Sequence, residues 1–106
     1  MTWVKSGHDS GNGTDQVGCA GCDPYVGDTS CKEYRPVLCL IQDGSPVPPG
    51  FTPDFYNGWQ RGHIGLTFPV LGLLLSSPAA GDLLCQYHSG PKWFMAEFHH
   101  FGSYGT

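Results

Sequence analysis

A chain of 106 residues, 40% of them hydrophobic and 13% aromatic, is long enough to bury one core, so we expect a single domain over residues 1–106. Five Lys and Arg lie singly among nine Asp and Glu, which argues against the clustered positive charge that nucleic-acid binding requires. The longest apolar run, residues 70–75, is far shorter than the about 20 residues that cross a bilayer. We therefore expect neither a nucleic-acid nor a membrane partner.

Residues 1–18 are polar and rich in glycine, and their large apolar side chains are Trp3, Val4 and Val17. This composition predicts a flexible or loosely packed arm that Trp3 pins to the domain. Residues 1–5 also lack the apolar stretch that a signal peptide contains.

Five cysteines follow, four of them within a segment dense in turn-forming residues: Cys19, Cys22, Cys31, Cys39 and Cys85. Where regular structure is sparse, disulfides stabilise a small domain, so we expect two bridges and one remaining thiol. The spacing does not fix the pairing. Disulfides persist in oxidising compartments, which predicts an extracellular or periplasmic protein.

Two other roles are open to the pair Cys19 and Cys22, which has the CxxC spacing. A zinc site would need a second ligand pair at similar spacing, whereas Cys31 and Cys39 lie eight residues apart. A thiol-redox site would place the CxxC at the start of a helix, and the flanking residues are glycine-rich. A thiol-redox protein remains an alternative to structural disulfides.

The middle of the chain predicts short strands joined by a proline-rich loop. Residues 36–41 form an apolar run that indicates a buried strand. Residues 45–53 hold four prolines and must form an extended surface loop, because proline lacks an amide donor. Residues 63–68 and 70–75 predict two strands or one bent strand.

A helix over about residues 78–88 has the clearest local signals, because Ser77 can cap free amides and Pro78 suits the first turn. The pair Gly90 and Pro91 predicts its end. A strand over residues 93–98 should follow. The helix face expected to point inward consists of Ala80, Leu83, Leu84 and Tyr87, with Cys85 near it. These elements together predict a small α+β domain with a short antiparallel sheet and one main helix.

Residues 62–99 contain Thr67, Gly72, Ser76, Ser77, Ala80, Leu84 and Cys85, followed by residues 92–99, Lys-Trp-Phe-Met-Ala-Glu-Phe-His. This pattern resembles the first helix and the following strand of C-type-lectin-like domains, and also resembles uncharacterised secreted bacterial proteins. A complete lectin-like domain would continue with a second cysteine pair and a calcium loop. The resemblance therefore implies a half-domain or a divergent minimal version, and no calcium or sugar ligand of the family has a counterpart here.

Near the end of the chain, Glu97, His99 and His100 offer a carboxylate and two imidazoles, and His63 could join them. This set is an alternative site for a divalent metal, although neither an HExxH motif nor a facial triad is present. Otherwise we expect no cofactor. The sequence also lacks the GxSxG, GxxxxGK and GxGxxG motifs, so we lean against an enzyme and name no catalytic residue.

Residues 54–63 combine aromatic, amide and cationic side chains in a segment prone to turns. Such mixtures suit the recognition of a carbohydrate or a protein, although the aromatic rings could instead fill the core. The residues that we select as ligand-binding are Asp54, Tyr56, Asn57, Trp59, Arg61 and His63.

Self-association is a further expectation, because residues 63–75 are apolar, low in charge and able to pair edge to edge. The function predicted from the sequence is a non-enzymatic binding or structural module that can form a homodimer. A metal-binding protein and a thiol-redox protein are the alternatives.

Overall fold

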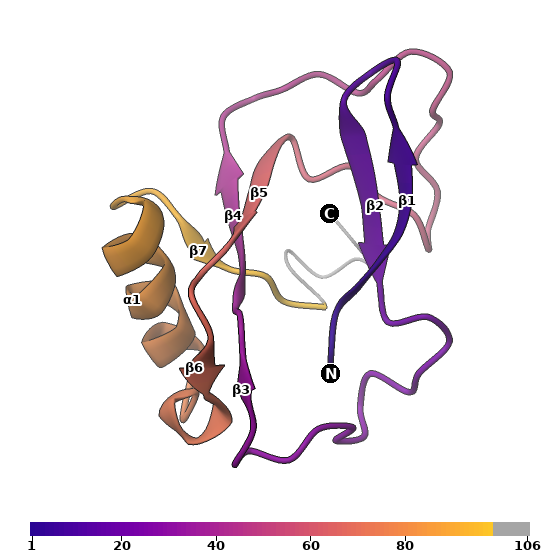
Figure 1. Cartoon of the computed structure of the whole chain (residues 1–106). Helices are drawn as coiled ribbons and strands as arrows, with labels where there is room; N and C mark the ends of the chain where they lie inside the picture. The colour runs from indigo at the N-terminus through magenta and orange to yellow at the C-terminus, as the bar shows by residue number, and fades with distance from the viewer. Residues whose placement is uncertain (99–106) are drawn as a thin grey trace.

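A computed structural model of the chain describes residues 1–98. Within this range one α-helix and short antiparallel strands form an α+β fold (Figure 1), which confirms the predicted class. The elements in chain order are β1 (Val4–Asp9), β2 (Thr14–Gly18), β3 (Tyr34–Arg35), β4 (Leu38–Gln42), β5 (Gly62–Leu66), β6 (Val70–Leu71), the 3-10 helix η1 (Gly72–Leu74), α1 (Pro78–Ser89) and β7 (Phe94–Met95). No helix in residues 1–98 combines the length and apolarity needed to span a membrane.

Strand β4 is the centre of the fold, because it pairs with β5 on one side and with β7 on the other. Both of its faces are covered. Cys39 points toward α1, with Val37 in the same buried cluster. Leu38 and Leu40 belong to a second cluster, against which side chains of the N-terminal segment pack. Burial on both faces explains why the sequence of this strand is continuously apolar rather than alternating.

Helix α1 begins and ends where the local signals place it. The backbone N–H of Ala80 donates to Ser77 Oγ at 3.1 Å, and Pro78 occupies the first turn. The N–H of Gly90 donates to the Gln86 carbonyl at 2.9 Å, with Gly90 at φ 128°. The predicted helix over residues 78–88 is therefore confirmed to within a residue.

The inward face of α1 agrees with the prediction at Leu84, which packs against the core cluster of Cys85, and differs from it at Leu83 and Tyr87. Leu83 and Tyr87 are 65% and 83% exposed, whereas Gly81 and Cys85 are buried. A Cβ atom on Gly81 would lie 2.2 Å from Met95 Sδ, so the absent side chain lets the helix approach β7 closely. The face turned inward is thus set by Gly81 and by the bonded Cys85.

Two predicted strands are shorter than expected. Strand β6 covers only the first two residues of the predicted strand 70–75, and η1 follows it at once. The chain turns there because the Leu73 N–H donates to the Cys31 carbonyl at 2.9 Å. Strand β7 covers two residues of the expected 93–98. The alternation of faces holds from Trp93 to Ala96 and is lost at Glu97, which lies beyond the end of the strand.

Residues 1–18, for which we expected an arm, contain an antiparallel hairpin. Strands β1 and β2 pair from Val4↔Gly18 to Asp9↔Thr14, with an irregularity between Lys5 and Gly7. At its tip the Asp9 carboxylate accepts the N–H of Gly11 at 2.9 Å, and Gly13 takes φ 67°. The hairpin lies on the opposite side of the three-stranded sheet from α1 (Figure 1).

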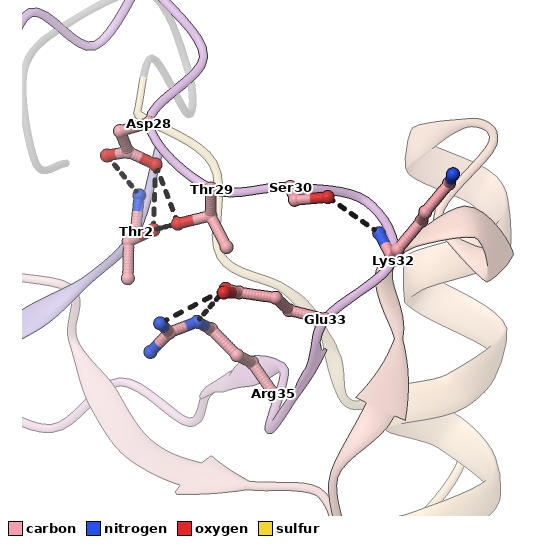
Figure 2. A network of polar contacts seen from close by, with 7 residues as sticks. All are labelled: Thr2, Asp28, Thr29, Ser30, Lys32, Glu33 and Arg35. Carbon is pink, nitrogen blue, oxygen red and sulfur yellow. Dashed lines mark hydrogen bonds and ion pairs between the residues drawn. The ribbon is translucent and has the colours of Figure 1, made fainter.

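A polar network holds the start of the hairpin to the segment before β3 (Figure 2). The Thr2 N–H donates to Asp28 Oδ2 at 2.9 Å, and the Thr2 hydroxyl donates to Asp28 Oδ1 at 2.7 Å and also contacts the Thr29 hydroxyl. These contacts fix Trp3, the next residue, beside the Leu38 and Leu40 cluster.

Candidate functional site

A cavity of about 1120 Å³ lies between the hairpin, the loop that joins β4 to β5, and the sheet. We call it the hairpin cleft. Figure 1 shows this loop reaching from the sheet toward the hairpin and returning to β5. The cleft is lined by Trp3 and residues 7–9 and 12–17, by residues 45–52, 54 and 56–60, and by Leu38, Leu40, residues 62–64, Ala96 and Glu97. Its size is at or above the about 300–1,000 Å³ of small-molecule sites.

The residues predicted to bind a ligand divide into two groups. Five of them line the hairpin cleft, namely Asp54, Tyr56, Asn57, Trp59 and His63. Arg61 is not among the lining residues. Its role is in the backbone: at φ 60° its carbonyl accepts the N–H groups of Asp43, Gly44 and Ser45 at 3.0–3.1 Å. This shared acceptor closes the base of the loop that forms one wall.

Trp59 is a half-buried ring anchored in the wall, because its indole N–H donates to the Ser45 carbonyl at 2.8 Å. The bond uses its polar group and leaves the ring for apolar contact. Trp3, also half-buried, lines the same cavity from the other end of the chain. The sequence predicts Trp3 as the anchor of an arm rather than as a cleft residue. The one signal for a binding role is that this tryptophan stands alone in a polar segment.

Asp54 and Asn57 build a turn in the loop. The Asp54 carboxylate accepts the N–H groups of Tyr56 at 2.8 Å and of Asn57 at 2.7 Å, and the Asp54 N–H donates to the Asn57 carbonyl at 2.9 Å. These N–H groups, that of Tyr56 first, hold the pKa of the Asp54 carboxyl below its ordinary value. The two side chains therefore shape the wall of the hairpin cleft.

His63 has a partner at the rim, since its Nδ1 lies 2.8 Å from Asp43 Oδ2. Glu97 lines the cleft, but no cluster of three His, Cys, Asp or Glu side chains suited to a metal occurs in residues 1–98. His99 and His100 lie outside the described residues. The predicted metal set is thus not assembled by the part of the chain that the structure describes.

Five aspartates whose carboxylates accept hydrogen bonds have a lowered pKa. In each case the largest cause is a hydrogen bond that the carboxylate accepts. The donors are the side chain of Asn12 for Asp9, that of Lys5 for Asp15, the Thr2 hydroxyl for Asp28, the Ser45 hydroxyl for Asp43 and the Tyr56 N–H for Asp54. A carboxyl whose folded pKa is depressed stabilises the fold above its unfolded pKa of about 3.9 and loses that contribution as the pH falls through the folded pKa.

We therefore expect the urea midpoint of unfolding to decrease as the pH is lowered from about 4 to 2, because these carboxylates become protonated in that window. Far-UV circular dichroism at a series of pH values measures it. The Asp54→Asn variant, which keeps an acceptor oxygen but does not titrate, should show a smaller decrease. A midpoint independent of pH below 4 would contradict the hydrogen-bonding pattern of these turns.

Four of the five cysteines are bonded. Cys39 in β4 and Cys85 in α1, both fully buried, form one disulfide, and Cys19 and Cys22 form the other. Cys31 is free and exposed. The Cys19–Cys22 pair follows β2 and encloses a turn in which Ala20 takes φ 53°. No helix begins there, so the setting differs from that of redox CxxC motifs.

Comparisons of the chain with protein-family models, with curated proteins and with solved structures found no match. The fold and the cleft define the class: a small α+β domain stabilised by disulfides, with a large cleft between a hairpin and a proline-rich loop. The lectin-like resemblance of residues 62–99 stays a prediction.

Proposed function

We propose that the protein is a non-enzymatic binding module of extracellular or periplasmic type, and that its ligand lies in the hairpin cleft. The observation that carries the proposal is the presence of Trp3 and Trp59 in one large cavity. Half-buried aromatic rings with a few polar groups around them are typical of ligand sites. The two disulfides support an oxidising compartment.

The architecture supports a cleft that exists before the ligand arrives. One wall is fixed by the Trp59 to Ser45 bond and by the Arg61 carbonyl, and the other is the hydrogen-bonded hairpin. Because hydrogen bonds hold both walls, a ligand would need to order few further residues on binding. A carbohydrate or a protein segment would both fit this description.

The three tryptophans provide an internal control for the test. Trp3 and Trp59 line the hairpin cleft, whereas Trp93 packs with the cluster on the helix side of the sheet. In a ¹⁵N-correlated NMR spectrum, oligosaccharides and peptides are titrated and the three indole N–H signals are followed. A ligand of the cleft should shift the signals of Trp3 and Trp59 saturably and leave Trp93 in place. The proposal is overturned if no ligand does so.

The Trp59→Ala variant should lose at least about tenfold in affinity for such a ligand, since aromatic anchors dominate binding. We expect it to stay folded, with the free energy of unfolding lowered by about 1–2 kcal/mol, less than the about 3–5 kcal/mol for a fully buried ring. Chemical denaturation and the NMR titration measure the two effects. Complete unfolding of the variant would show that the loop is core and remove the binding assignment.

A further inference from the structure

Apart from His8 and His63, which lie beside Asp15 and Asp43, the ionisable side chains that line the hairpin cleft within residues 1–98 are carboxylates or Tyr56. Asp9, Asp15, Asp54 and Glu97 line it, and no Lys or Arg does so within residues 1–98. Asp15 is compensated, since Lys5 Nζ lies 2.9 Å and His8 Nδ1 2.7 Å from Oδ1. The remaining three carboxylates favour positive charge in the space between the walls.

Glu97 differs from the other carboxylates of the cleft. Asp9 and Asp54 accept hydrogen bonds that build turns, and Asp15 has its ion pairs. Glu97 is half-buried and makes no ion pair or hydrogen bond with any of residues 1–98. It follows Ala96, whose side chain packs with Leu38 and Leu40 in the floor of the cleft. A partly desolvated carboxylate that finds no partner among the described residues can be compensated by a cation that a ligand brings.

The aromatic rings fit the same ligand. Trp3 and Trp59 can pack against the apolar stem of a Lys or Arg side chain and attract its cationic head through their faces. A neutral sugar would leave Glu97 without its counter-charge. A cavity of about 1120 Å³ also has room for several residues of an extended chain.

Building on the proposed function, we propose that the hairpin cleft binds an extended peptide segment of a partner protein and receives its Lys or Arg side chain. Glu97 pairs with the cationic head, and Trp3 and Trp59 contact the stem. Specificity for a basic segment then comes from the Glu97 carboxylate, while the rings supply apolar contact area.

The test uses a library of N-acetylated, C-amidated octapeptides in which one central position is Lys, Arg, citrulline or Glu and the other positions vary. Citrulline has nearly the shape of Arg and no charge. Binding to the immobilised full chain should enrich Lys and Arg at least about tenfold over citrulline, and the enrichment should fall as salt is raised. Selected peptides should shift the indole signals of Trp3 and Trp59.

The Glu97→Gln variant should lose the preference for Lys and Arg over citrulline, and a correlation spectrum confirms its fold. The matched control is Glu33→Gln, which removes an exposed carboxylate that pairs with Arg35 and does not line the cleft (Figure 2). This control should bind like the unchanged protein.

The outcomes separate the two proposals. If citrulline peptides or neutral oligosaccharides shift Trp3 and Trp59 as strongly as the basic peptides, the basic-peptide inference is wrong and the binding cleft stands. The inference is also wrong if Glu97→Gln and Glu33→Gln weaken binding equally. If no compound shifts the two tryptophans, both proposals fail.

Discussion

Replacing Cys39 and Cys85 together by alanine should lower the free energy of unfolding by about 4 kcal/mol, as the entropy of closing a loop of this length predicts. The bridge joins residues 46 apart in the sequence and connects β4 to α1. Both cysteines are completely buried, so the substitution also removes packed sulfur atoms from the core. Since small domains are stable by about 5–15 kcal/mol, a large share of the total would be lost. Urea unfolding followed by circular dichroism measures the change.

The matched comparison is the double variant Cys19→Ala with Cys22→Ala. This bridge joins two half-buried cysteines that follow β2 and are three positions apart in the sequence, and the same relation gives about 2 kcal/mol or less. Equal losses in the two double variants would mean that the long bridge does not hold the helix to the sheet as described.

The Gly62→Ala variant is expected to be destabilised by at least about 3 kcal/mol, at the upper end of the range for overpacking. A Cβ atom at this position would lie 1.7 Å from the carbonyl oxygen of Ile41, in the backbone of the neighbouring strand. No side-chain rotation relieves such a contact, so β4 and β5 must separate locally. The adjacent Arg61 carbonyl, which accepts three N–H groups, would move with them.

Gly65→Ala, on the same strand, is the control for this substitution. Its Cβ would lie 3.4 Å from the Trp93 ring, which is close to ordinary van der Waals contact. We expect a stability change within about 1 kcal/mol for this variant. If both substitutions have the same small effect in chemical denaturation, the pairing of Gly62 with Gln42 is incorrect.

The elements that could be predicted are those with local signals. Ser77, Pro78 and Gly90 define α1 within the sequence itself, and the apolar run around Leu40 marks β4. The inward face of α1 was predicted only in part, because it depends also on Gly81, which has no hydrophobic signal and acts through its contact with Met95. Pairing of the cysteines likewise depends on tertiary contacts that spacing does not encode.

The hairpin was missed for a similar reason. Its strands expose most of their side chains, and the core contacts come from Val17 and from Trp3, which precedes β1, so no alternating pattern appears. One wall of the cleft could be predicted from the composition of residues 54–63. The opposite wall could not, because residues far apart in the sequence meet there. Self-association through residues 63–75 stays a prediction, and Leu66 and Leu73 in this run are exposed.

The most direct test of the disulfide-stabilised fold is a thiol map of the native protein. After alkylation under denaturing, non-reducing conditions, we expect one modified cysteine, Cys31. In a tryptic digest, the fragments 33–61 and 62–92 should stay linked through the disulfide between Cys39 and Cys85. Five modified thiols in a chain that was well folded before denaturation, or a bridge to Cys31, would contradict both the fold's stabilisation and the assignment to an oxidising compartment.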